Sequence, residues 1–419
     1  MTEVSSVTQV GAGPRPARWS DLDRLRAISP MCDATIDEVR GRRIRIGEQW
    51  LADFASCNYL GFDLDEEIAA RIAPEVARWG THPSWSRLLG NPRIYLDIEE
   101  RLTELLGAPD TLVLPTITHI HLSVIPALVG TGHLFLESVA HKTIYDGCVM
   151  ARGMGATLQR FPDGDLDELA RMLRATPSGE TRMICIDGVN SMTGNLPDLA
   201  AYAAVARENG ALLYVDDAHG FGVIGERHRD ETSPYGSRGN SIVRHVGEGY
   251  DGIVLVGGFS KSYSSLLAFL ALPTRMKEYL KLASAPYLYS GPSPTASLAT
   301  VMAGFDVNET RGDALRAELY HKTERVLETV HVRGISTPNT SGLPIIELPL
   351  APGVPIEEVG DILFRHGIYV TLAAYPLVPR DQVGFRVQVT AANQDDEIEE
   401  LCAVLEQLAD AGMLRRIDG

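Results

Sequence analysis

Two short apolar runs, each followed by reactive polar residues, constrain this 419-residue chain more than any other feature. Residues 211–215 lead into Asp216-Asp-Ala-His219, and residues 251–257 lead soon afterwards to Lys261. Short apolar runs of this kind are typical of strands in a parallel sheet that is covered on both faces. Because parallel strands end at the same edge of a sheet, Asp216, His219 and Lys261 are expected to lie there together.

A carboxylate and an amine at one sheet edge are what the cofactor pyridoxal phosphate (PLP) requires. The cofactor needs an amine to hold its aldehyde as a Schiff base, and a carboxylate to keep its ring nitrogen protonated. Lys261 and Asp216 supply these groups. A single aspartate at a strand end is commonly a solvated turn, and a single lysine commonly lies on the surface. Their occurrence together, in this order, favours a PLP enzyme.

The pattern from about residue 50 to residue 294 alternates short apolar strands with helical stretches such as 199–209. This alternation predicts an α/β fold with a mostly parallel sheet and a ligand site at the carboxyl ends of the strands, where Asp187 also falls. After Pro294 the pattern changes to a long helix, short strands and a final helix. We therefore expect an arm over 1–50, a large domain over 51–294 and a smaller α+β domain over 295–419. The expected strands of the large domain are 111–114, 133–136, 183–186, 212–215 and 253–256.

The final helix has clear start signals. Asn393 is the expected N-cap, and the acidic residues 395–397 suit the positive end of the helix dipole. An apolar face then follows at helical spacing, formed by Ile398, Leu401, Cys402, Leu405 and Leu408.

Composition excludes several functions. The net charge of −17 argues against nucleic acid as the main partner, because binding to a phosphate backbone relies on basic clusters. An apolar run of about 18 residues and a secretory signal are both missing from the sequence, so no membrane span is expected. The five cysteines form no CxxC pair, and no metal site is expected. This use of cysteine suits a reducing compartment, so the cytoplasm is the predicted location.

Four segments together resemble one branch of the fold-type I PLP enzymes, the α-oxoamine synthases. They are Asp187-Gly-Val-Asn-Ser-Met-Thr-Gly194, Asp216-Asp-Ala-His-Gly-Phe-Gly-Val-Ile-Gly225, Lys261, and Arg386-Val-Gln-Val-Thr-Ala391. The similarity runs from about Asn58 to the C-terminus. It implies the fold-type I transferase architecture and a divergent member of that family.

The resemblance also implies roles for residues around the cofactor ring. Asp216 would pair with the pyridinium nitrogen, His219 would hydrogen-bond the phenolic oxygen, and His141 would stack on the face of the ring. Ser191 would support the same oxygen or the lysine. Asp187 would lie nearby, where the family more often has glutamate.

For the substrate, the resemblance implies a carboxylate site. Arg386 matches the arginine that binds the α-carboxylate of the amino acid, since a guanidinium fork suits that planar group. Asn58 matches a residue that lines the amino-acid pocket.

The chain departs from the family pattern around the phosphate. Thr116-Ile117-Thr118 stands where Ser-Gly-Phe is usual, Gly258 stands where threonine is usual, and Gly291 replaces a threonine that the neighbouring subunit normally supplies. Backbone N–H groups at the start of the following helix can donate to a phosphate instead. The hydroxyls of Thr116, Thr118, Ser260 and Ser290 are the other expected donors.

A further departure concerns the loop where the second substrate approaches. It reads Gly80-Thr-His-Pro-Ser-Trp85-Ser86-Arg87, with tryptophan in place of glycine. Trp85 packs at a subunit interface or, alternatively, faces a planar or cationic second substrate. The resemblance implies a homodimer with shared active sites, in which residues 80–87 and 289–292 come from the partner.

The function that we predict is carbon–carbon bond formation from the quinonoid of a small α-amino acid, by decarboxylative condensation with an acyl donor. The first alternative is β- or γ-elimination and replacement, for example with S-adenosylmethionine and a nicotinamide-type electrophile. Transamination is a third possibility. A degenerate relative acting as a binding subunit is a fourth, and the presence of both Lys261 and Asp216 argues against it.

Overall fold

A seven-stranded sheet forms the centre of the protein in the computed structural model, which describes residues 20–177, 179–290 and 292–417. The strand order is β4-β10-β9-β8-β7-β5-β6, and all pairs are parallel except the two that β10 makes. The mostly parallel α/β sheet expected from the sequence is thus confirmed. Its strands are β4 (Asp110–Leu114), β5 (His133–Glu137), β6 (Thr157–Phe161), β7 (Arg182–Asp187), β8 (Leu212–Asp216), β9 (Ile253–Gly258) and β10 (Ala268–Leu272).

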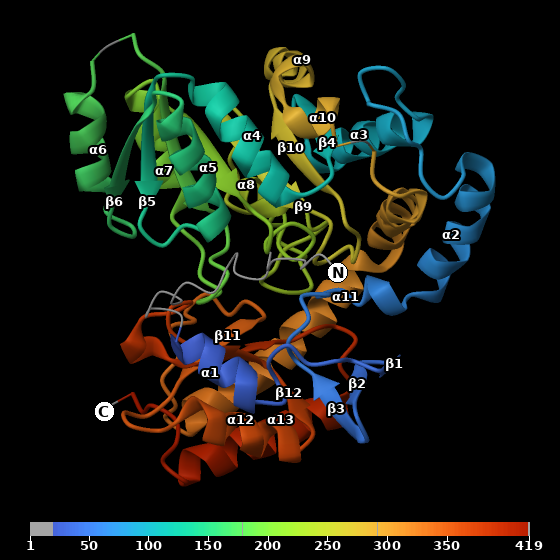
Figure 1. Ribbon diagram of the computed structural model, residues 1–419, viewed down its shortest axis with the longest axis vertical. Helices are drawn as coiled ribbons and strands as arrows, with labels where there is room; N and C mark the ends of the chain where they lie inside the picture. The colour runs from blue at the N-terminus through green and yellow to red at the C-terminus, as the bar shows by residue number, and fades with distance from the viewer. Residues whose placement is uncertain (1–19, 178, 291, 418–419) are drawn as a thin grey trace, which may run out of the picture.

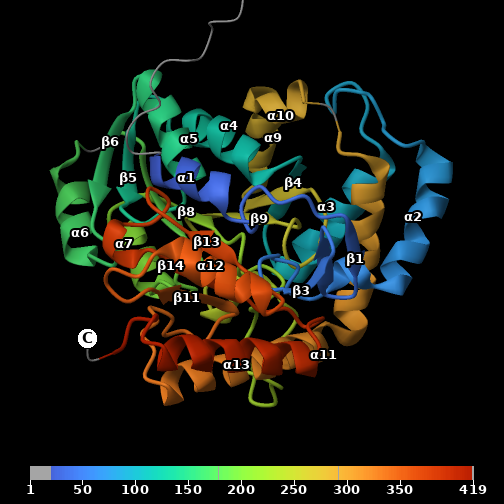
Figure 2. The same cartoon turned by 60° about the horizontal axis from the view of Figure 1, so that its bottom comes forward.

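Both faces of this sheet are buried. Successive residues of β8, Leu213, Tyr214 and Val215, belong alternately to two separate hydrophobic clusters, one on each side of the sheet. This two-sided burial explains why the strands read as continuous apolar runs. Figures 1 and 2 show the covering helices. They are α3 (Arg93–Leu106), α4 (Ile117–Val129), α5 (Lys142–Gly153), α6 (Leu166–Ala175), α7 (Leu199–Glu208), α8 (Ser241–His245), α9 (Thr274–Ala283) and α10 (Ala285–Leu288). Helix α2 (Glu66–Trp79) packs against the long helix α11 (Thr295–Val332) instead.

The C-terminal part forms a second layer below the large sheet, and the long helix α11 (Thr295–Val332) connects the two (Figure 1). It contains a three-stranded antiparallel sheet in the order β11-β14-β13 and the helices α12 and α13. The bounds are β11 (Ile345–Pro349), α12 (Ile356–Arg365), β12 (Ile368–Tyr369), β13 (Thr371–Ala373), β14 (Gly384–Gln388) and α13 (Asp395–Asp410), with short 3-10 turns at Phe62–Leu64 and Arg380–Gln382.

Part of the expected arm over residues 1–50 has regular structure and lies with the C-terminal part. Helix α1 (Ser20–Ile28) is followed by β1 (Glu38–Arg40), β2 (Arg43–Ile46) and β3 (Gln49–Asp53). Strand β3 pairs in parallel with β12, so these strands share a sheet with a C-terminal strand. Periodicity did not reveal this pairing, because its partner lies some 315 residues further along the chain. Residues 1–19 of the expected arm lie outside the described residues.

The cap predicted for the last helix is wrong by one residue. Gln394 is the N-cap of α13 and forms a capping box with Glu397. Asn393 instead accepts hydrogen bonds from the backbone and hydroxyl of Thr390, at 2.9 and 2.8 Å, and closes the preceding turn. An Asn side chain can either cap a helix or close a turn, and the path of the neighbouring backbone decides which of the two it does.

Among the helices of the described residues, none has the length and apolar character that a membrane crossing requires.

Candidate active site

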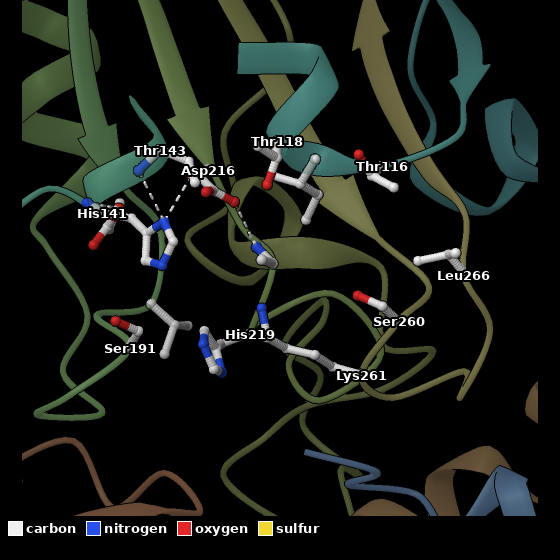
Figure 3. A pocket seen from close by; sticks show the side chains of 14 residues that line it. Thr116, Thr118, His141, Thr143, Ser191, Asp216, His219, Ser260, Lys261 and Leu266 are labelled. Carbon is white, nitrogen blue, oxygen red and sulfur yellow. Dashed lines mark hydrogen bonds between the residues drawn. The ribbon is translucent and has the colours of Figure 1, made fainter. Parts of the chain in front are cut away.

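A cavity of about 330 Å³ opens where β7, β8 and β9 end (Figure 3). Ten of the residues proposed from the sequence line it, contributed by five separate stretches of the chain. The predicted gathering at the carboxyl edge of the sheet is therefore present in the structure. These ten are Thr116, Ile117, Thr118, His141, Asp187, Ser191, Asp216, His219, Ser260 and Lys261, and the wall is completed by Thr143, Val189, Ala218 and Leu266.

Asp216 is the last residue of β8, and its carboxylate is held from two sides. Its Oδ1 accepts the backbone N–H of Ala218 at 3.0 Å, and its Oδ2 lies 2.9 Å from Nε2 of His121. Burial by itself raises the pKa of Asp216, but the hydrogen bond from His121 and the positive charge of Lys261 outweigh it. The pKa is consequently lower than usual, so Asp216 is ionised at neutral pH.

Asp187 ends the neighbouring strand directly beside Asp216, in register with it. Its Oδ1 accepts the backbone N–H of His141 at 2.9 Å, whereas its buried Oδ2 has no hydrogen-bond partner among the described residues. Burial and the nearby charge of Asp216 raise the pKa of Asp187 well above its usual value. The pKa values of these two adjacent carboxyl groups are thus shifted in opposite directions, and Asp187 holds a proton more readily than Asp216.

Lys261 follows β9 and extends into the centre of the cavity between Asp216 and His219 (Figure 3). Burial lowers the pKa of its amino group below the usual value, although the charge of Asp216 opposes part of this effect. A lysine amine with a lowered pKa is a better nucleophile and proton carrier near neutral pH.

The two histidines have different surroundings. His219 is buried, and its Nδ1 lies 2.8 Å from the hydroxyl of Tyr59. Burial lowers the pKa of His219 well below its usual value, so the ring is neutral. His141 is the N-cap of α5, with Nδ1 2.7 Å from Oγ1 of Thr143, and burial lowers its pKa also. Tyr59 was not predicted, although it is adjacent to Asn58, which was.

A larger cavity, of about 770 Å³, continues from the first and shares His141, Ser191, His219 and Lys261 with it. Its wall includes Arg386 on β14, which donates to the backbone carbonyl of Ser191 at 2.5 Å. The guanidinium Nε of Arg386 is buried without a partner among the described residues. The other lining residues are Cys57, Leu136, Glu137, Val139, Ala140, Lys142, Tyr145, Arg160, Met192, Thr371, Leu372, Ala373, Pro376 and Leu377.

The remaining proposed residues lie elsewhere. Asn58 donates from its amide to Asp63 at 3.0 Å and lines neither cavity, whereas the adjacent Cys57 lines the larger one. Trp85, Ser86 and Ser290 also lie outside both cavities of their own chain. Gly291 is outside the described residues.

The structure accounts for two of the departures from the family pattern at once. A Cβ atom at Gly258 would lie 2.6 Å from Cδ1 of Ile117, which is closer than real carbon atoms approach. The Ile117 side chain therefore occupies the space that a threonine at 258 would need. Thr116 caps α4 by accepting the N–H of His119, so the start of this helix faces the cavity with Thr118 and backbone donors.

This arrangement fits pyridoxal phosphate. An amine, an ionised carboxylate, two imidazole rings and a helix N-terminus surround one cavity, and a buried carboxyl oxygen of Asp187 lacks a partner within the residues that the structure describes. Lys261 would hold the aldehyde, Asp216 the ring nitrogen, and the start of α4 the phosphate. Fold and site together define a fold-type I PLP-dependent enzyme.

Comparison with known proteins identifies the branch. The profile of the aminotransferase class I and II family matches residues 53–405. A putative 8-amino-7-oxononanoate synthase of Desulforudis audaxviator is 31% identical, with 83% of this chain and 86% of the relative aligned. An 8-amino-7-oxononanoate synthase of Chromohalobacter salexigens is also 31% identical, over 85% and 88%. The fold resembles serine palmitoyltransferase of Sphingomonas wittichii, with a TM-score of 0.84 at 22% identity over 96% and 99% of the two chains.

The chain belongs to the PLP-dependent α-oxoamine synthases, enzymes that form carbon–carbon bonds by decarboxylative condensation. The cofactor and the transferase class predicted from the sequence are confirmed.

The contact between Ile117 and Gly258 predicts non-additive substitutions. Gly258→Thr alone forces a clash, and we expect it to destabilise the apoprotein by about 1–3 kcal/mol and to weaken cofactor binding. Ile117→Ala removes Cδ1 and Cγ1, so the double variant should recover most of both losses. Thermal unfolding and cofactor titration of the four proteins give the coupling, which we expect to exceed about 1 kcal/mol. Strict additivity would show that the two side chains do not compete for this space.

Proposed function

We propose that this enzyme joins a small α-amino acid to the acyl group of a thioester, with loss of the amino-acid carboxylate. The new bond links Cα of the amino acid to the acyl carbon, the Cα–carboxylate bond breaks to release CO₂, and the thiol leaves. The observation that carries this proposal is the continuity of the two cavities, because Arg386 and Lys261 both line the larger one and Lys261 lines the smaller one as well.

When bound, the cofactor supplies an electron sink for the electrons left at Cα. The chain's own residues orient the reactants. Arg386 would receive the α-carboxylate, because its Nε is free of other described partners and its guanidinium lines the larger cavity. Lys261 would take and return the proton at Cα through Nζ, since its lowered pKa suits that exchange near neutral pH.

The buried His219 and the more exposed His141 would hold the ring. Burial keeps the pKa of Tyr59 well above its usual value, so its hydroxyl retains a proton that it can donate to Nδ1 of His219. The proton of the His219 ring then lies on Nε2, where it can be donated to the phenolic oxygen of the cofactor. His141 would cover the face of the ring, with Ser191 and Asp187 close by.

The larger cavity would receive the acyl group. Its lining combines apolar side chains of the large domain, Val139 and Met192, with Leu372, Pro376 and Leu377 of the C-terminal part. The cationic side chains of Lys142 and Arg160 also line it, at 5.2 and 5.9 Å from the centre of the Tyr145 ring. An acyl chain with an anionic carrier or end group fits this combination.

The test is a substrate matrix. The holoenzyme is incubated with glycine, alanine or serine and with thioesters of increasing chain length, and CO₂, free thiol and product mass are measured. We expect one pair to release CO₂ and thiol in equal amounts. Release of a methylthio compound from S-adenosylmethionine, without thioester consumption, would instead support elimination and replacement. Keto-acid formation alone would support transamination.

We also propose that the enzyme is a cytoplasmic homodimer in which each subunit completes the active site of the other. The loop between α2 and α3 lies beside the segment that leads from α10 into α11. The backbone N–H of Thr295 donates to the carbonyl oxygen of Thr81, and the guanidinium of Arg87 lies over the Tyr287 ring. Together the loop and the segment present exposed apolar side chains. A monomer rarely exposes such a group without a partner. These side chains are Trp85, Leu88, Leu89 and Tyr289.

Subunit mixing should therefore restore activity. Lys261→Ala removes the cofactor lysine, and Trp85→Asp disables the loop that would complete the active site of the partner subunit. Mixed dimers carry one site in which both residues are intact, so at most about a quarter of the wild-type activity should return for random exchange. Size-exclusion chromatography confirms that subunits exchange. Activity of a stable monomer, or absence of recovery despite exchange, would contradict shared sites.

A further inference from the structure

His121 is a fully buried histidine that the proposed chemistry does not yet use. It lies on α4, three residues after Thr118, so the two share a face of the helix. Thr118 lines the smaller cavity. His121 lines neither cavity, and its Nε2 contacts Oδ2 of Asp216. His121 is thus placed to act on Asp216 without touching substrate or cofactor.

Both nitrogens of the His121 ring are engaged. Nε2 lies 2.9 Å from Oδ2 of Asp216, and Nδ1 lies 2.8 Å from the hydroxyl of Tyr214. Tyr214 and Asp216 are two residues apart on β8 and therefore point to the same face of the sheet, which lets one ring bridge them. A carboxylate can only accept, so Nε2 carries the proton, and the Tyr214 hydroxyl can donate to Nδ1.

The surroundings of Asp216 make this contact important. Asp187 lies beside it on β7, Lys261 follows β9, His141 precedes α5, and Asp217 is next in the chain. The two carboxyl groups Asp187 and Asp216 stand in register and both line the cavity. Two adjacent buried carboxyl groups hold one negative charge far more readily than two. A donor that reaches only one of them decides where that charge lies.

We propose that His121 is a positioning residue that directs the negative charge of this carboxyl pair onto Asp216, with Tyr214 holding the proton on Nε2. The proposal rests on the role of Asp216 as partner of the cofactor ring nitrogen. Asp187 is then the carboxyl group that retains a proton, and its Oδ2, which has no hydrogen-bond partner in the described part of the chain, can donate to a group in the cavity. Neither His121 nor Tyr214 was recognised from the sequence, because a histidine within the apolar run of α4 resembles an ordinary buried side chain.

Two amide substitutions separate positioning from packing. The amide nitrogen of His121→Gln extends as far as Nε2 and can still donate to Asp216, whereas that of His121→Asn reaches only as far as Nδ1. Both replace the ring by a smaller polar group, so each is the control for the other. The holoenzymes are titrated with pH while the visible absorbance of the lysine-bound cofactor is followed, and cofactor affinity and thermal unfolding are measured in parallel.

His121→Asn should raise the midpoint of this titration by about one pH unit and weaken cofactor binding about tenfold. Without the donor, Asp216 loses its charge and the ring nitrogen loses its proton. That positive charge normally lowers the pKa of the nitrogen shared by Lys261 and the cofactor, so its loss raises the midpoint. His121→Gln should stay within about 0.3 unit of the wild type, and Tyr214→Phe should show a smaller shift in the same direction as His121→Asn.

Equal midpoints for the wild type and the two amide variants would overturn the proposal, even if both variants unfold at lower temperature. If His121→Asn does not fold, Tyr214→Phe carries the test, and an unchanged midpoint there would have the same meaning. The titration uses no second substrate. A wrong assignment of the condensation substrates therefore leaves it unaffected, while loss of the absorbance in the wild type would point to failure of the Lys261 assignment.

Discussion

Lys261→Ala should abolish covalent attachment of the cofactor and reduce turnover by many orders of magnitude. Among the described residues, Lys261 is the lysine that lines the smaller cavity, of about 330 Å³, together with Asp216 and His219. Alanine leaves no amine to bond to the cofactor aldehyde or to carry the proton at Cα. Borohydride reduction followed by mass spectrometry measures the attachment, and product formation measures turnover.

Lys281→Ala is the matched control for this substitution. Lys281 lies on α9 and pairs with Glu278 at the surface, away from both cavities. Its replacement should leave attachment and turnover unchanged, since an exposed ion pair contributes little. A cofactor adduct that borohydride still fixes to the Lys261→Ala protein would show that another amine holds the cofactor.

Asp216→Asn should have the second largest effect, with the cofactor still bound, though more weakly, and turnover reduced by several orders of magnitude. The amide keeps the shape of the side chain and can still contact His121, but it carries no negative charge to keep the ring nitrogen protonated. Protonation of that nitrogen makes the ring an electron sink. Cofactor titration and single-turnover kinetics with the amino acid measure the two effects separately.

Asp410→Asn, at the exposed end of α13, serves as the control and should be silent. Near-normal turnover of Asp216→Asn would require another carboxylate at the ring nitrogen. Asp217 is a poor candidate, because its Oδ2 accepts the backbone N–H of Ile242 and its side chain does not line the cavity. Burial also raises the pKa of Asp217 to about 8, which leaves it protonated at neutral pH.

The sequence was sufficient to predict the large sheet and most of the residues that line the smaller cavity. Strands β7, β8 and β9 are apolar between their ends because helices cover both faces of the sheet. The reactive groups Asp187, Asp216 and Lys261 stand at or soon after the carboxyl ends of these strands. Local order along the chain therefore predicted which side chains would meet at one edge. The expected strands differ from the observed ones by one or two residues at their ends, as at β9, which extends to Gly258.

The same reasoning could not choose between neighbouring residues at the start of the last helix. Asn393 was proposed as the helix cap, yet the cap is Gln394. The competing residues are adjacent, and the backbone path, which depends on distant packing, decides which one caps the helix. Asn58 was implied for the amino-acid pocket by the family resemblance alone; its amide donates to Asp63 and it lines neither cavity of its own chain, so its role stays a prediction.

The sequence by itself determined which chemical groups the strands of the large sheet bring to one edge. Those groups were sufficient to predict the cofactor and the family. Only the tertiary structure decided how those groups are charged and spaced. His121 reaches Asp216 from a helix 95 residues away in the chain, and Ile117 fills the space above Gly258 from the start of the same helix. Tyr59 joins His219 across 160 residues. Such contacts follow from how helices and loops pack against the sheet, and the periodicity of a single segment carries no record of its partner.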